Sequence, residues 1–146
     1  MPIAVEHIEE IRTTPERAWQ LIDDLPRFAE WLPPCVSLSK VGSGPNAVGD
    51  TLRYVFQQGG RQQEMSGRIV AREAGARLHC LYDDSAFTVS VDLRVEPAAN
   101  GTRTTHRIAI TPKTLMGRLM SPLIRLGLRK QTTDAARNLR RLLETV

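Results

Sequence analysis

The sequence has 146 residues, of which 41% are hydrophobic and 25% charged, and its formal net charge is +4 at pH 7. These values are typical of one globular domain, so residues 1–146 are expected to form a single domain that can contain a cavity. Cys35 and Cys80 lie far apart and outside any metal-ligand spacing, so neither a disulfide nor a metal site is expected. The chain opens without a basic and apolar leader, and no apolar run approaches the ~20 residues of a membrane span. We therefore expect a cytoplasmic protein.

The N-terminal part predicts one strand followed by two short helices. Residues 3–12 contain neither Gly nor Pro and mix apolar with charged positions, as a strand does. Thr14 is a good N-cap and Pro15 suits the first helical position, so a helix begins there. A second short helix follows it and ends at the double proline 33–34.

From residue 36 the apolar residues alternate with polar ones, which predicts strands. The clearest alternation covers 87–95, where every second residue is large and apolar. Gly59-Gly60 and Asn100-Gly101 are typical of tight hairpin turns, so neighbouring strands are expected to be antiparallel. The six predicted strands cover residues 36–41, 52–56, 65–71, 78–82, 87–95 and 105–110.

The C-terminal part predicts one long amphipathic helix. Beyond Pro112, apolar residues follow helical spacing as far as Val146, which indicates a helix of roughly 30 residues. Pro122 and Gly127 lie inside it, so a kink or short break is expected near Pro122. Residues 115–146 contain seven basic and two acidic residues, a local balance of +5.

This order of elements predicts an α+β fold. Strands that follow one another through hairpins form a sheet that twists and curls. We expect a curved seven-stranded antiparallel sheet wrapped around the long C-terminal helix, with the two short helices after the first strand. A cavity remains between sheet and helix unless large side chains fill it.

The segment from Thr14 to Pro33, TPERAWQLIDDLPRFAEWLP, resembles the N-terminal signature of the START/birch-pollen-allergen superfamily, often called SRPBCC. In that signature a Pro-Glu-x-(Val/Ala)-Trp helix start leads to an Asp and then to a Trp-x-Pro before the second strand. The chain is most similar to the polyketide cyclase/dehydrase and lipid-transport group. The resemblance implies a helix-grip fold with a hydrophobic ligand tunnel, in a family that includes carriers, hormone binders, aromatases and cyclases.

Candidate ligand-binding residues come from the apolar faces of the predicted strands and helix. His106 shares a strand face with Ile108 and Ile110, so its imidazole could bind a ligand carbonyl or act as a base, or be an ordinary paired core residue. Tyr54 and Tyr82 could offer hydroxyl groups to a ligand or make structural hydrogen bonds. The candidates are Tyr54, Phe56, Met65, Tyr82, Phe87, Val89, Val91, His106, Ile108, Met116, Leu119, Met120 and Leu123.

The leading interpretation is binding or transport of a small hydrophobic ligand, such as a lipid, polyketide or isoprenoid-like molecule, without a cofactor. Residues 116–127, loosened by Pro122, would form the gate, and their arginines could contact an anionic membrane. The first alternative is a polyketide cyclase or dehydratase that uses His106 with a tyrosine or carboxylate. The second is a ribosome- or protein-interaction module that uses the basic C-terminal helix. Residues 115–146 contain no aromatic residue, so nucleic acid is not an expected partner, and the oligomeric state stays open.

Overall fold

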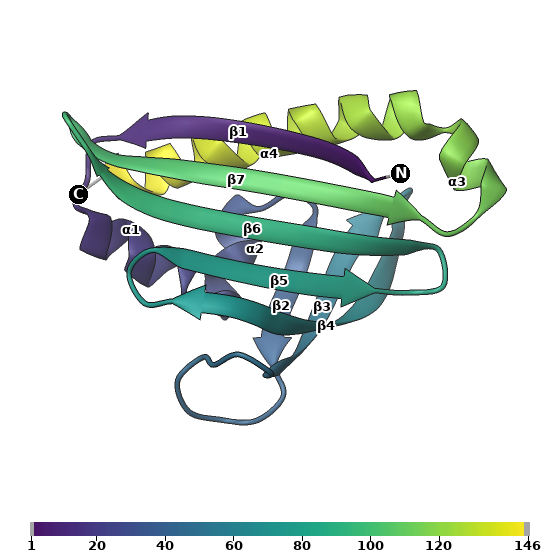
Figure 1. Ribbon diagram of the computed structural model, residues 1–146, viewed down its shortest axis with the longest axis horizontal. Helices are drawn as coiled ribbons and strands as arrows, with labels where there is room; N and C mark the ends of the chain where they lie inside the picture. Colours follow the sequence, from purple (N-terminus) through teal and green to yellow (C-terminus); the bar gives the residue numbers. More distant parts are fainter. Residues whose placement is uncertain (1, 145–146) are drawn as a thin grey trace.

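The computed structural model describes residues 2–144 and contains the expected seven-stranded antiparallel sheet. The strand order across the sheet is β1-β7-β6-β5-β4-β3-β2, so β1 and β2 form its two edges (Figure 1). All strands except β1 pair with their neighbours in the chain, as the hairpin turns predict. The strands are β1 Ile3–Ile11, β2 Cys35–Lys40, β3 Thr51–Gln58, β4 Arg61–Glu73, β5 Arg77–Asp83, β6 Phe87–Ala98 and β7 Gly101–Pro112.

The helices also follow the predicted order. Thr14 caps the first of them, since its hydroxyl oxygen accepts a hydrogen bond from the backbone N–H of Arg17 at 3.2 Å. The apolar side of this helix, which includes Trp19 and Ile22, is buried. The second short helix consists of a 3-10 turn and a single α-turn. The helices are α1 Pro15–Ile22, η1 Leu25–Arg27, α2 Phe28–Trp31, α3 Leu115–Leu119 and α4 Ser121–Glu144.

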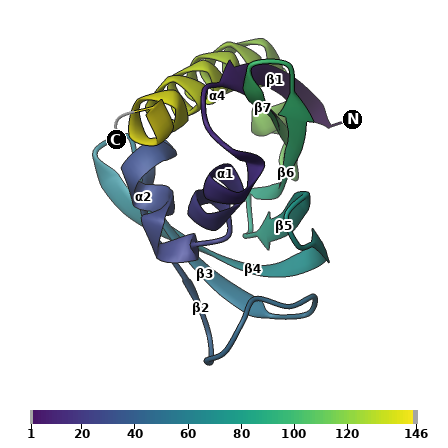
Figure 2. The ribbon, with the colours of Figure 1, turned by 90° about the vertical axis from the view of Figure 1, so that its left-hand side faces the viewer.

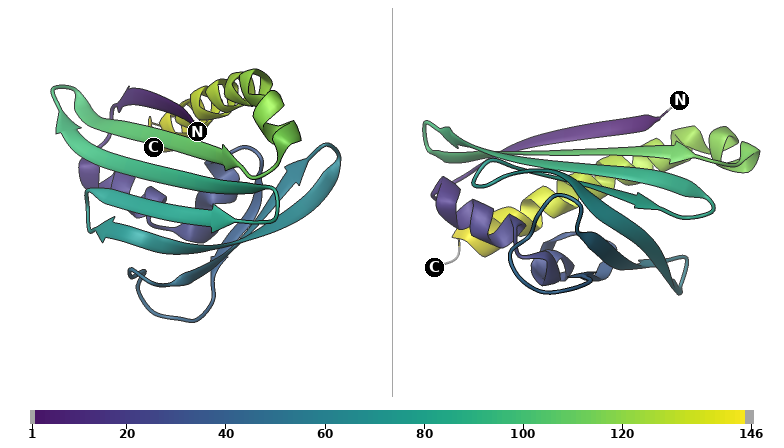
Figure 3. Two further views of the ribbon diagram at one scale, coloured as in Figure 1. Left: turned by 45° about the vertical axis from the view of Figure 1, so that its right-hand side comes forward. Right: turned by 60° about the horizontal axis from the view of Figure 1, so that its bottom comes forward.

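The sheet curls around α1 and α2, and α4 closes the open side of the curl (Figure 2). Register shifts between Cys35 and Ser37 on β2 and between Ile69 and Ala71 on β4 bend those strands, as β-bulges do. Helix α4 packs mainly along β1 and also contacts α2 and β7. It therefore touches one edge of the sheet closely and stands away from the middle strands (Figure 3). The helix-grip α+β fold is confirmed.

The C-terminal helix is interrupted where the sequence predicts a break. Pro122 has no N–H to donate to the carbonyl of Arg118, and the Ser121 hydroxyl donates to that oxygen instead at 2.7 Å. The chain changes direction at Met120, between α3 and α4. Val146, the last position of the predicted helix, lies outside the described residues.

A polar cluster joins α1 to the sheet. Asp23, which follows α1, accepts two hydrogen bonds from the guanidinium of Arg72 on β4, at 3.1 and 2.7 Å. Asn46 donates to the same carboxylate at 2.9 Å, and Arg72 lies over the ring of Trp19. Asp23 lies within the segment that resembles the N-terminal signature, and it attaches α1 and the 41–50 loop to the sheet.

Candidate functional site

A cavity of about 440 Å³ lies between the concave face of the sheet and α4. Helix α2 and the segment after it form one end, strands β3 to β7 form the floor, and the first half of α4 forms the roof. Most of its wall is apolar. The cavity is lined by Phe28, Leu32, Pro34, Tyr54, Phe56, Gln58, Met65, Tyr82, Asp84, Phe87, Val89, Val91, Ile108, Ile110, Leu123, Ile124, Gly127, Leu128 and Gln131.

Three aromatic rings form part of the floor. The ring centroid of Tyr54 lies 5.2 Å from that of Phe56 and 5.1 Å from that of Tyr82. Gly67 lies beneath Tyr82, and a Cβ at this position would come within 2.4 Å of the ring, so only glycine leaves it room. Burial raises the pKa of both tyrosines, so their hydroxyl groups stay protonated and can donate hydrogen bonds.

The exposed part of the cavity lining lies at the end of the sheet where α3 begins, and we take it as the mouth of the cavity. The β3–β4 hairpin, the β5–β6 turn and the exit of β7 all lie at this end, because these strands are antiparallel neighbours. Gln58, Leu123 and Gly127 line the cavity at this end and are exposed. Asp84 also lines the mouth, and one of its carboxylate oxygens accepts hydrogen bonds from the backbone N–H groups of Ala86 and Phe87.

Nine of the thirteen candidate residues line the cavity: Tyr54, Phe56, Met65, Tyr82, Phe87, Val89, Val91, Ile108 and Leu123. Met116, Leu119 and Met120 do not, and their side chains are 69, 68 and 42% exposed. The reason is the bend before Pro122, which turns α3 away from the sheet, so that the helical spacing of these residues does not continue the inner face of α4.

His106 is buried on the inner face of β7, as the alternation predicts, but it lies outside the cavity wall. Its ring meets that of Trp31 edge-on, with centroids 6.2 Å apart. Neither ring nitrogen has a hydrogen-bond partner among the described residues, and neither does Nε1 of Trp31. Burial lowers the pKa of His106 to about 4, so the imidazole is neutral at pH 7.

The sequence-based selection missed lining residues from three places. Phe28, Leu32 and Pro34 come from the α2 region, whose distance to the cavity depends on how the chain folds back. Gln58, Asp84 and Ile110 belong to the strands or the turn after β5. The others lie on one face of α4, where 124, 127, 128 and 131 follow helical spacing. That spacing is visible in the sequence, but it does not say which partner the face meets.

Within residues 2–144 no three His, Cys, Asp or Glu side chains gather as metal ligands, and no helix is long and apolar enough to cross a membrane. Cys35 and Cys80 are free and buried, and burial raises the pKa of their thiols to about 11 and about 12. Thiolate chemistry is therefore suppressed at both positions.

The fold and its cavity define a protein of the START/birch-pollen-allergen class. The chain belongs to the polyketide cyclase / dehydrase and lipid transport family, whose model matches residues 2–144. This confirms the resemblance seen in the N-terminal signature. No curated protein matches the chain.

Solved structures show the same fold at low identity. The Zhui aromatase/cyclase from Streptomyces sp. R1128 superposes with a TM-score of 0.81 at 11% identity, over 99% of this chain and 94% of that one. A START superfamily protein from Mycobacterium smegmatis gives 0.79 at 12% identity, over 97% of each chain. The protein TTHA0849 from Thermus thermophilus gives 0.78 at 17% identity, over the full length of both chains. At these identities the similarity concerns the fold alone.

Proposed function

We propose that the protein binds or transports a small hydrophobic ligand in the cavity between the sheet and α4. The observation that carries this proposal is the cavity itself: about 440 Å³, with a largely apolar wall and a mouth at one end of the sheet. Small-molecule sites usually enclose roughly 300–1,000 Å³ and have this kind of lining. A packed core would leave no such space, since protein interiors rarely contain voids larger than a water molecule.

The chemistry of the wall indicates the class of ligand. Its polar side chains are two tyrosines, two glutamines and Asp84, and among residues 2–144 no Lys, Arg or His lines the cavity. A charged acid would have no cation to pair with inside, so the ligand is neutral where it is buried. Tyr54 can donate a hydrogen bond to an oxygen atom of the ligand, whereas the side chain of Tyr82 already interacts with Cys80. These features support a lipid, polyketide or isoprenoid-like molecule with few polar groups.

A second candidate is a polyketide cyclase or dehydratase, favoured by the tyrosine-lined cavity and by similarity to a protein named as an aromatase/cyclase. His106 gives this candidate little support, because it is neutral and lies outside the wall. Proton transfer would have to use Tyr54, Tyr82 or Asp84. A linear polyketide thioester incubated with the purified protein distinguishes the two proposals, since a carrier returns it unchanged.

The interaction-module alternative has less support. Arg140, on the basic helix, contacts Glu9 at 3.0 Å and donates to the carbonyl of Glu10. Lys130 forms an ion pair with Asp134 on its own helix. Part of the positive charge of α4 is therefore used within the chain and is not available to a partner.

The experiment is a titration of the purified protein with Nile red, a neutral lipophilic dye whose fluorescence rises in apolar surroundings. Val91→Phe places a ring in the cavity from the floor strand β6, so we expect its affinity to fall by about tenfold. Leu81→Phe is the control, since Leu81 is half-buried and outside the cavity lining. Equal binding by Val91→Phe and the wild type would contradict a ligand site in this cavity.

A further inference from the structure

An exposed apolar surface lies beside the mouth of the cavity. Ten large hydrophobic side chains are exposed among the described residues, and six of them fall within residues 115–126. Their exposed fractions are 71, 69, 68, 42, 59 and 62% in chain order. We name this surface the elbow patch, and it consists of Leu115, Met116, Leu119, Met120, Leu123 and Leu126. Contiguous apolar surface of this kind marks an interaction site in most folded chains.

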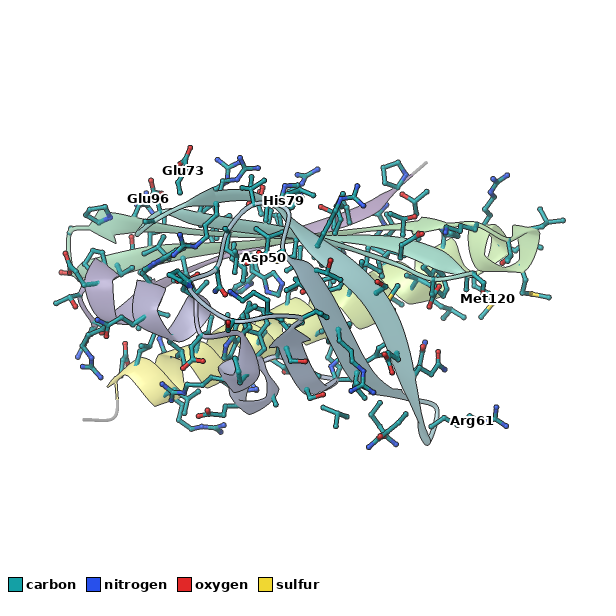
Figure 4. The ribbon with its side chains drawn as sticks, turned by 90° about the horizontal axis from the view of Figure 1, so that it is seen from below. Asp50, Arg61, Glu73, His79, Glu96 and Met120 are labelled. Carbon is teal, nitrogen blue, oxygen red and sulfur yellow. The ribbon has the colours of Figure 1, made fainter. Side chains whose placement is uncertain are left out.

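The elbow patch protrudes. Helix α3 extends beyond the ends of β6 and β7 and then turns into α4 (Figures 1 and 3). Met120 lies at this end of the molecule (Figure 4). Side chains that are mostly exposed on a projecting bend do not form a groove. A protein partner would need a complementary pocket, whereas the interfacial layer of a bilayer accepts projecting aliphatic side chains directly.

The charge around the patch is positive. Residues 113–133 contain five basic residues and no acidic one, and two of the five, Lys113 and Lys130, form ion pairs with Asp83 and Asp134. Arg118, between Met116 and Leu119, has no hydrogen bond or ion pair to its guanidinium among the residues that the structure describes, and neither has Arg129. Long basic side chains beside an inserted apolar surface reach lipid phosphates and favour anionic lipids. Two copies of the patch facing each other would bring like charges together, which disfavours a dimer through this surface.

From the protruding aliphatic residues and the unopposed positive charge, we propose that the elbow patch docks this protein on an anionic lipid membrane. The proposal rests on the proposed function, because docking serves to deliver a hydrophobic ligand to the cavity. Leu123 belongs both to the elbow patch and to the cavity wall, so docking would place the mouth against the bilayer. A hydrophobic ligand then passes between membrane and cavity without crossing water.

The test is vesicle flotation with purified protein. Vesicles contain either phosphatidylcholine alone or phosphatidylcholine with phosphatidylglycerol. The wild type is expected to float with the anionic vesicles, and the double variant Met116→Ser/Leu119→Ser to bind them about tenfold less. Val41→Ser/Val48→Ser is the matched control, because these side chains are 66 and 61% exposed but lie in the 41–50 loop. It should float like the wild type.

Several outcomes would overturn the proposal: a wild type that floats with neither vesicle, a double variant that floats like the wild type, or an Arg118→Gln variant with unchanged preference for anionic vesicles. Binding to an acidic protein without binding to vesicles would also overturn it.

Nile red titration without vesicles separates this proposal from the proposed function. Met116 and Leu119 do not line the cavity, so the double variant should keep wild-type affinity for the dye. Dye binding without flotation therefore contradicts membrane docking and leaves the cavity site standing. Flotation without dye binding contradicts the cavity site and leaves membrane docking standing.

Discussion

His106 has a fully buried imidazole, and that burial makes the stability of the fold depend on pH. The pKa of its imidazole is lowered from 6.5 in the unfolded chain to about 4 in the folded one. Between about pH 4 and pH 6.5 the imidazole therefore binds a proton in the unfolded chain but not in the folded chain. The contribution to stability is complete above pH 6.5 and is lost as the pH falls to about 4.

The substitution His106→Leu should remove this pH dependence. A pKa difference of this size corresponds to about 3 kcal/mol, so the wild type should lose about that much free energy of unfolding between pH 7 and pH 4 through His106. Leucine also replaces two unpartnered nitrogens by apolar atoms, so the variant should match or exceed the wild type at pH 7. Urea denaturation at both pH values measures this.

His79 supplies an internal comparison for that experiment. Its pKa is also lowered, mainly by burial, so it lowers stability in the same direction below pH 6.5. His79 is present in the wild type and in His106→Leu, so the difference between their free energies of unfolding as a function of pH is due to His106. Parallel profiles would show that the buried imidazole is protonated in the folded state.

His106 also shows what strand alternation predicts and what it leaves undecided. The alternation with Ile108 correctly predicts that both side chains face inward. It does not predict that Ile108 reaches the cavity while His106 lies against Trp31. Alternation is a property of the local backbone. Which inward-facing residues of β7 reach the cavity depends on where α2 and α4 pack, and these helices come from distant parts of the chain.

At the scale of elements, the cluster around Asp23 connects α1 to β4. Arg72 and Asp23 are both only 21% exposed, and two hydrogen bonds join them. Hydrogen bonds to charged and partly buried groups are worth more than exposed ion pairs. The connection therefore holds the C-terminal end of α1 against the sheet.

Arg72→Ala should lower the free energy of unfolding by about 2 kcal/mol, because it leaves the Asp23 carboxylate without its cation. Arg53→Ala is the matched control, since Arg53 makes a similar two-bond contact with Glu64 on adjacent strands, but both side chains are more than half exposed. The control should cost clearly less, because solvent screens an exposed ion pair. Equal losses in urea denaturation would show that burial adds nothing to the Arg72 contact.

The C-terminal helix shows a similar division between local and long-range information. Pro122 correctly predicts the break, because a missing N–H disrupts a helix wherever it occurs. The direction of α3, which precedes the break, was not predictable, and it decides that Met116 and Met120 are exposed. Both residues were expected to contact the ligand, but they do not line the cavity and belong to the elbow patch instead.

At the scale of the whole molecule, ligand binding and folding are linked. A ligand that binds only the folded chain stabilises it by about 2.7 kcal/mol when its free concentration is 100 times Kd. Nile red at that excess should raise the free energy of unfolding of the wild type and of Leu81→Phe by this amount. At the same dye concentration Val91→Phe should gain only about 1.4 kcal/mol, since its affinity for the dye is expected to be about tenfold lower.

Thermal or urea unfolding with and without the dye provides the measurement. Stabilisation of all three proteins to the same extent would place the dye outside the cavity. No stabilisation of the wild type, despite a fluorescence response, would mean that the dye binds folded and unfolded chains equally.

The sequence by itself determined the order of strands and helices, the cap at Thr14 and the break at Pro122. It also determined the alternation by which every second side chain of residues 87–95 faces inward. These features depend on backbone geometry over a few residues. Only the tertiary structure decided that α4 stands away from the middle strands, which residues line the resulting space, and that α3 projects from it. Those distances result from the packing of α4 against β1 and α2, which joins segments 90 or more residues apart in the chain.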